Sequence, residues 1–149
     1  MNESISVDVS GAKEMMEALS TRKIMGMQKK VLRKAGNVVK KDAKSKFRSA
    51  LPNANKKNPK YTDTLLDAIK VSVWEDNNGA YSKVHTMGSK KSTSGTFRAR
   101  FFEGGTVLRK TAKGQNRGSI APLYFFTSAT NATKNKVEST IDTELSKVI

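Results

Sequence analysis

Side chains that could perform catalysis are scarce in this sequence of 149 residues. It contains no cysteine, which excludes thiol nucleophiles, disulfides and cysteine-based metal sites. Its single histidine, His85, lies between Val84 and Thr86 in a predicted strand, where a structural or surface role is expected. The acidic residues in the middle of the chain are few and do not cluster as a metal site requires. We therefore expect no catalytic residue, no metal site and no cofactor, and interpret the protein as a non-enzyme.

Basic residues dominate the composition instead. The chain has 28 lysines and arginines against 13 acidic residues, which gives a formal net charge of +15. Residues 22–60 alone contain 14 basic residues and a single acidic one, Asp42, for a local net charge of +13. Such a segment fits a polyanionic partner, either nucleic acid or an acidic protein surface. A solvated helix face that keeps the protein soluble accounts for the charge equally well.

A long helix from about residue 21 to residue 50 is predicted to carry this charge. Apolar residues recur there every three or four positions, which is the spacing of an amphipathic helix. Gly26 and Gly36 are poor helix formers, so the helix is expected to bend or to begin later, and Pro52 ends it. Six basic residues on its opposite face are our candidates for contact with a polyanion: Lys30, Arg33, Lys34, Lys41, Lys44 and Arg48.

Shorter patterns predict the remaining elements. Alternating apolar residues indicate strands at residues 5–9 and 97–102, and a hairpin over residues 69–87 that turns at Asn78-Gly79. Helical spacing indicates a helix over residues 12–20, a helical turn capped by Thr62 or Asp63, and a last helix from about Leu123. Residues 52–60 form a polar, proline-containing loop.

Two further segments show no periodic pattern, and we expect mobile loops near 88–96 and 104–121. The second is rich in glycine and lysine and begins with Gly104-Gly105, which permits a sharp turn or a close backbone approach. Long segments of this kind are typically functional or become ordered on binding. The 104–121 segment is therefore either an assembly arm that folds on a neighbour or a basic loop without a partner.

Three stretches follow one another in a recognisable order. The first is an amphipathic helical region that ends in VVKKDAKSKF, residues 38–47. The second is TDTLLDAIKVSV, residues 62–73, in which Thr64 stands where the family named below usually has glycine. The third runs from ARFFEGGT to RGSIAPLYFFTSA, residues 99–129, with an aromatic-Glu-x-Gly-Thr motif followed by Pro-x-x-Phe. In this order and spacing they resemble the tail-completion, or head–tail joining (neck), proteins of long-tailed bacteriophages.

The resemblance implies an α+β fold. Combined with the predicted elements, it gives a single domain over residues 1–149, in which an antiparallel sheet of about four strands with a central hairpin packs against the long N-terminal helix and a C-terminal helix. It also implies a structural protein of the virion that, in several copies, typically a hexamer, completes the tail as a ring around the DNA channel. The implied partners are other copies of the chain, the head connector or stopper, the tail tube proteins and, transiently and without sequence specificity, the genomic DNA. No membrane partner is implied, and the protein would pass from the host cytoplasm during assembly to the tail and neck of the virion.

The third stretch supplies the residues that we expect to contact a neighbouring subunit or ring. They are Arg100, Phe102, Glu103, Gly104, Gly105, Thr106, Arg109, Arg117, Gly118 and Pro122. The alternative function is that of a small basic nucleic-acid-binding protein, ribosome-associated or nucleoid-like. The charge favours this alternative, but the sequence carries no recognised RNA-binding signature. A basic nuclease would require the acidic metal cluster that we do not find.

Overall fold

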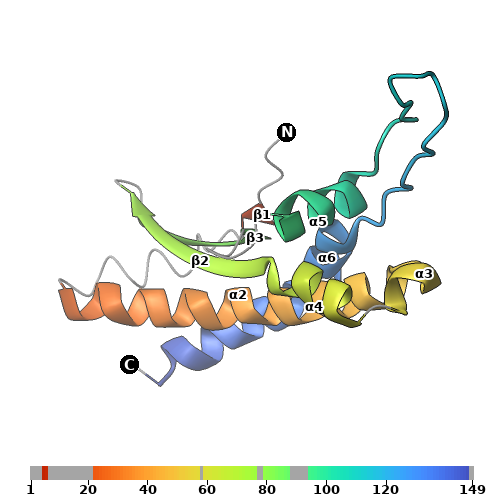
Figure 1. The fold of residues 1–149 in the computed structure, drawn as a ribbon. Helices are drawn as coiled ribbons and strands as arrows, with labels where there is room; N and C mark the ends of the chain where they lie inside the picture. Colours follow the sequence, from red (N-terminus) through yellow and green to blue (C-terminus); the bar gives the residue numbers. More distant parts are fainter. Residues whose placement is uncertain (1–4, 7–21, 58, 77–78, 88–93, 148–149) are drawn as a thin grey trace.

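A computed structural model describes residues 5–6, 22–57, 59–76, 79–87 and 94–147. Its elements, in chain order, are β1 (Ile5–Ser6), α2 (Arg22–Ala50), α3 (Asn53–Lys56), α4 (Pro59–Asp67), β2 (Ile69–Asp76), β3 (Gly79–Thr86), α5 (Ser94–Gly104) and α6 (Phe125–Leu145). The long helix α2 lies between the β2–β3 hairpin on one side and α6 on the other (Figure 1). The predicted α+β fold with its long N-terminal helix, central hairpin and C-terminal helix is confirmed.

Helix α2 is 29 residues long, which corresponds to about 44 Å. Its apolar residues at four-residue intervals, Val31, Ala35, Val39, Ala43 and Phe47, are all buried. Residues four positions apart form a row that winds slowly around a helix, and the residues of this row face the core. Neither Gly26 nor Gly36 interrupts the helix, so the expected later start is wrong.

The reason for a glycine at position 36 is the closeness of the hairpin. A Cβ atom built on Gly36 would lie 2.5 Å from Ser82 Oγ and 2.7 Å from a methyl carbon of Val71. Because both contacts are shorter than van der Waals distance, only glycine allows β2 and β3 to pack so closely on the helix. Gly36 is therefore a packing residue.

In the described residues, the sheet contains three strands in the order β1-β3-β2, and both pairings are antiparallel. The hairpin register pairs Val71 with Val84 and Trp74 with Tyr81. The expected strand at 5–9 appears as β1 at Ile5–Ser6, and residues 7–9 lie outside the described residues, as does the helix predicted over 12–20. The fourth strand, predicted at 97–102, is wrong because that segment belongs to helix α5.

The helical assignment of α5 follows from its burial pattern. A strand would bury Phe97, Ala99 and Phe101 together, whereas Ala99 and Phe102 are buried and Phe101 is 41% exposed. Residues three apart share a helix face and lie on opposite faces of a strand. The six-residue FRARFF pattern was too short to distinguish the two periods.

The polar loop predicted over 52–60 is also partly wrong, because it contains α3 and the start of α4. Pro59 occupies the first position of α4, where a missing backbone N–H is tolerated. Helix α4 therefore begins before Thr62, and the expected capping position lies within the helix.

Candidate functional site

A long arm leaves the body of the protein between α5 and α6 (Figure 1). We define the arm as residues 105–123. Its two legs run side by side, because the Thr106 N–H donates to Ile120 O (2.9 Å) and the Arg117 N–H donates to Arg109 O (2.7 Å). An isolated bridge between Lys110 and Asn116 continues this pairing outward. The segment that showed no periodicity in the sequence is thus a narrow antiparallel ribbon.

The first leg begins at Gly105, whose backbone conformation suits only glycine. Its φ is +72°, and a Cβ atom there would lie 2.9 Å from both Ile120 O and Pro122 Cδ. Thr106 then fixes the two legs a second time, because its Oγ1 accepts the Ile120 N–H at 2.9 Å. Gly105 and Thr106 therefore close the base of the arm.

Glu103 completes this base from inside the protein. Only 4% of its surface is exposed. Its Oε2 accepts the Phe126 N–H at 2.9 Å, and its Oε1 accepts both the N–H (3.3 Å) and the hydroxyl (3.2 Å) of Thr127. These N–H groups are at the start of α6, where a carboxylate is favoured by free donors and by the helix dipole. Glu103 therefore caps α6 and fixes the point at which the arm re-enters the body.

The backbone before α6 explains why this remote cap is needed. Tyr124 is at the N-cap position with φ 46° and ψ 39°, and its side chain makes no capping hydrogen bond. A left-handed conformation is costly for a bulky residue and persists only where its surroundings impose it. Here the backbone N–H of Tyr124 donates to Glu103 O (3.3 Å) and that of Leu123 to Phe102 O (2.7 Å).

An aromatic cluster supports the base from below. Phe47 of α2 stacks on Phe125 of α6, with ring centroids 4.3 Å apart, and contacts Phe102 of α5 at 5.5 Å. All three rings are buried. Because α2, α5 and α6 meet at this cluster, the base of the arm is anchored in the core of the protein.

The outer part of the arm is exposed. Val107 is 84% exposed, more than any other large apolar side chain that the structure describes, and Leu108 is 55% exposed. No acidic residue occurs between residues 105 and 123. Four basic residues lie within the arm: Arg109, Lys110, Lys113 and Arg117. None of the four forms an ion pair with any side chain that the structure describes.

Nine of the ten predicted contact residues lie in the arm or at its base, in several different environments, and the tenth, Arg100, lies on α5. Phe102 and Glu103 are buried within the chain, and Gly105 and Thr106 close the base. Gly104 and Pro122 are exposed beside it. Exposed positions on the outer part are held by Arg109, Arg117 and Gly118, while Arg100 is exposed on α5 and donates from Nε to Thr86 Oγ1 at 3.3 Å.

The six predicted polyanion-facing residues of α2 also divide into two groups. Lys30, Arg33 and Lys41 are exposed and form no ion pair with the described part of the chain. The other three form ion pairs within the chain. Lys34 pairs with Glu144 of α6, Lys44 with Asp67 of α4 (3.6 Å) and Arg48 with Asp63 of α4 (3.5 Å).

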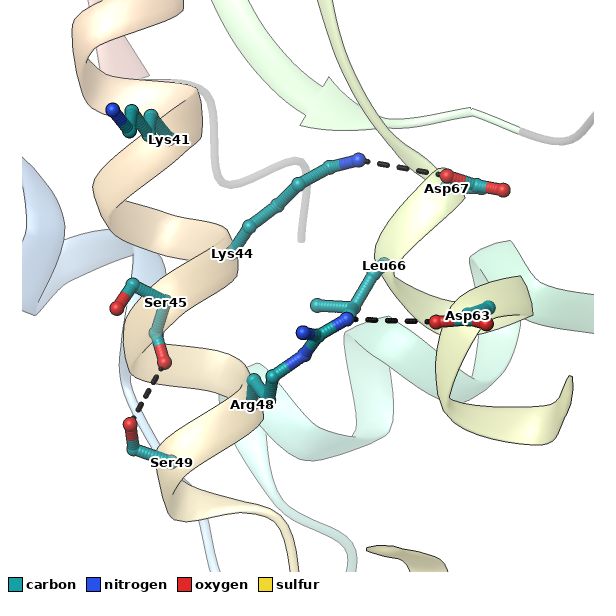
Figure 2. A pocket seen from close by; sticks show the side chains of 8 residues that line it. All are labelled: Lys41, Lys44, Ser45, Arg48, Ser49, Asp63, Leu66 and Asp67. Carbon is teal, nitrogen blue, oxygen red and sulfur yellow. Dashed lines mark hydrogen bonds and ion pairs between the residues drawn. The ribbon is translucent and has the colours of Figure 1, made fainter. Parts of the chain in front are cut away.

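Two of these ion pairs cross a groove of about 530 Å³ between α2 and α4. Figure 2 shows Lys44 and Arg48 reaching from α2 towards the two carboxylates of α4, while Lys41 has no partner among the side chains drawn. Beside the groove, burial and the charges of Lys44 and Lys70 lower the pKa of Lys40. Positive charge is therefore concentrated on the α2 side of this groove.

Other candidate chemistry is limited. Within the described ranges, no group of three or more histidine and acidic side chains is arranged to hold a metal ion. The Nε2 atom of His85 lies 2.8 Å from Ser72 Oγ, and burial lowers the pKa of the His85 imidazole. In the same part of the chain, no helix combines the length and the apolar character needed to span a bilayer.

Sequence reasoning did not identify the capping role of Glu103 or the ion pairs of Lys34, Lys44 and Arg48. One signal for the cap was available. Glu103 is the only acidic residue between residues 77 and 137, and the helix that follows lacks a serine, threonine, aspartate or asparagine at its N-cap. The ion pairs depend on which helices pack together, so no local pattern could have revealed them.

Comparison with known proteins gives one family. A family model described as "Bacteriophage HK97-gp10, putative tail-component" matches residues 12–105, which is more than half of the chain. The matched region includes α2, the hairpin, α5 and the first residue of the arm. No curated protein and no solved structure is similar enough to count as a match.

Proposed function

The chain belongs to the HK97-gp10-like family of bacteriophage tail components, and we propose that it completes the tail and joins it to the head connector. The family membership makes it a tail component of the virion and confirms the resemblance to a phage tail and neck family. Within that role we propose a structural, non-catalytic protein that acts as an oligomeric ring, typically a hexamer, around the DNA channel. Its other partners would be the connector or stopper and the tail tube proteins.

The observation that carries this proposal is the arm with its rigid base and exposed outer part. Buried hydrogen bonds and an aromatic cluster fix where the arm leaves the body. Beyond the base, few contacts with the chain itself hold the exposed apolar and basic side chains. A protruding apolar segment on a folded domain commonly marks a surface that contacts another protein.

Shortening the arm tests the proposal. Thr106 and Ile120 are hydrogen-bonded neighbours, so residues 107–118 can be replaced by Asn-Gly, which together with Ser119 leaves a three-residue hairpin loop between the two legs. We expect this variant to fold, as judged by circular dichroism and cooperative urea unfolding. When this variant is the only copy of the protein supplied during a phage infection, we expect unjoined heads and tails, seen by negative-stain electron microscopy.

A variant with a trimmed tip is the matched control. Residues 112–114 lie beyond the pair formed by the Thr111 N–H and Gln115 O, so their removal shortens the arm and leaves its base intact. A graded loss of joined particles from this control to the full replacement would support the proposal. Normal joining by the chain that lacks residues 107–118 would refute it.

We further propose that the unpaired side chains of α2 meet a polyanion in the assembled neck. That polyanion is the DNA passing through the channel or an acidic rim on the neighbouring ring. DNA that must slide is best held by sequence-independent phosphate contacts, which are salt-sensitive. Lys30, Arg33 and Lys41 support this role because their charges are exposed and not balanced by a described carboxylate.

Charge reversal separates this role from a merely solvated face. The test variant is Lys30→Glu, Arg33→Glu and Lys41→Glu, and the control reverses the exposed residues Lys56 and Lys57 elsewhere on the surface. We expect only the first variant to impair particle joining or DNA ejection. Equal behaviour of both variants would indicate that the α2 face serves solubility alone.

A further inference from the structure

The arm presents two arginines that lie opposite each other. The backbone hydrogen bond from Arg117 to Arg109 and the adjacent Lys110–Asn116 bridge place these residues on facing positions of the two legs. Like charges directly opposite in an antiparallel pair are destabilising. With no acidic residue within the arm to offset this repulsion, the pair is suited to carboxylates supplied from outside.

The described part of the chain contains a matching surface. Most of its carboxylates are already engaged: Asp42, Asp63, Asp67, Glu75 and Glu144 form ion pairs, and Glu103 is the buried cap. Among the carboxylates whose side chains the structure describes, Glu138 and Asp142 of α6 remain. Both are exposed, neither forms an ion pair with another described residue, and their four-residue spacing places them on one face of the helix.

The arm and this α6 face lie at opposite ends of the molecule. The arm extends from the end at which α6 begins, whereas Glu138 and Asp142 lie in the second half of α6, towards the C-terminus (Figure 1). Asp142 follows Phe125 by 17 residues, or about 25 Å of helix. Because the base directs the arm away from the body, its arginines cannot reach these carboxylates in the same copy.

We propose that the arm of one copy docks on the α6 face of the next copy, with Arg109 and Arg117 pairing with Glu138 and Asp142. This inference rests on the proposed ring, for which it supplies the contact. Two different surfaces that meet head to tail form a ring if the rotation closes and a filament if it does not. Val107, adjacent to the arginines and largely exposed, adds an apolar contact that would be shielded from water on docking.

Two charge-reversed proteins test the contact. The arm variant carries Arg109→Glu and Arg117→Glu, and the α6 variant carries Glu138→Lys and Asp142→Lys. Each variant then presents like charges on both surfaces, so we expect neither to self-associate. An equal mixture presents opposite charges at every contact, so we expect assemblies in which the two proteins alternate. Native mass spectrometry and negative-stain microscopy at low salt would measure the assembly of wild type, each variant and the mixture.

Disulfide cross-linking would detect the contact even if it is weak. The chain has no cysteine of its own, so only the introduced thiols can react. Val107→Cys in one copy and Asn135→Cys in another place single thiols beside the proposed contact, and we expect a disulfide-linked heterodimer. A cysteine at Lys57, on a different part of the surface, replaces Asn135→Cys in the control and is expected not to react.

The outcomes distinguish this contact from the proposed function. If wild type forms rings and both charge-reversed proteins form the same rings alone, the arm–α6 contact is refuted and the ring stands. If the mixture fails to assemble while wild type assembles, the contact is also refuted. If wild type does not assemble and the Val107→Cys and Asn135→Cys pair does not cross-link, the contact is refuted, and the particle-joining test of the shortened arm decides separately whether the chain completes tails.

Discussion

The two basic regions of this protein, the α2 face and the arm, differ in how their charges are balanced. On α2, three of the six basic residues singled out from the sequence pair with carboxylates of α4 and α6. In the arm, none of the four basic residues pairs with a described side chain. The first region uses half of its charge to connect helices, whereas the second leaves its charge available to a partner.

The same comparison distinguishes the base of the arm from its outer part. At the base, polar groups are buried and hydrogen-bonded, so each is expected to contribute to stability. Farther out, side chains are exposed and are expected to contribute to assembly alone. Substitutions in the two parts should therefore affect different measurements.

The largest expected effect is that of Glu103→Ala. The substitution removes three hydrogen bonds to a buried carboxylate and leaves the Phe126 N–H without a partner. Losing charge-assisted bonds and leaving a buried donor unsatisfied should reduce the free energy of unfolding by about 2–4 kcal/mol. Urea denaturation would measure this loss.

Glu138→Ala is the matched control, because it removes an exposed carboxylate from α6 that has no ion pair among the described residues. A change within about 0.5 kcal/mol is expected for it. Equal losses for the two variants would contradict the capping role of Glu103.

Gly105→Ala is expected to have the next largest effect. A methyl group at φ +72° is strained, and it would lie 2.9 Å from the Ile120 carbonyl oxygen. The expected loss is about 1–3 kcal/mol, together with a displacement of the arm that should reduce assembly. The neighbouring Gly104→Ala is the control, because nothing lies within 4 Å of its Cβ position. If Gly104→Ala were the more damaging change, our account of the base would be wrong.

Much of the fold was predictable because long periodic patterns determine it. Apolar residues every three or four positions identified α2, and the alternating strands around Asn78-Gly79 identified the hairpin. The errors concern short segments. FRARFF fits either period over six residues, and its helical state depends on burying Phe102 against Phe47, which lies 55 positions earlier in the chain. The position of the candidate arm was predictable from its glycines and lysines, but its capping carboxylate was not, because the cap joins residues 23 positions apart.

A smaller effect should separate the paired from the unpaired residues of α2. The Lys44→Ala and Arg48→Ala double variant breaks the two ion pairs to α4, and exposed pairs each contribute about 0–1 kcal/mol. We therefore expect a loss of at most about 2 kcal/mol that shrinks in high salt. The double variant Lys30→Ala and Arg33→Ala should leave the free energy of unfolding unchanged.

Binding to a polyanion should show the opposite order. With double-stranded DNA as the probe, the Lys30→Ala and Arg33→Ala double variant should bind more weakly. The slope of log binding constant against log salt concentration should become shallower by the amount that corresponds to about two lost phosphate contacts. The Lys44→Ala and Arg48→Ala variant should bind more nearly like wild type, because those charges are already paired. Identical salt slopes for the two variants would remove the distinction between paired and unpaired residues.

The smallest expected effect is the pH dependence contributed by Glu144. Hydrogen bonds from Lys147 and then Lys34 lower the pKa of this carboxyl below its usual value in the folded protein. Because the folded pKa lies below the unfolded one, the contribution to stability is present above the unfolded pKa, near 4.5, and is lost as the pH falls through the folded pKa. Glu144→Gln should therefore flatten the acid limb of a plot of melting temperature against pH.

Glu138→Gln, which removes an acidic residue without an ion pair from the same helix, should leave that limb closer to wild type. Lys34→Met should reproduce part of the flattening, since Lys147 still pairs with Glu144, and an unaltered limb in Lys34→Met would show that this residue of α2 belongs with the unpaired ones.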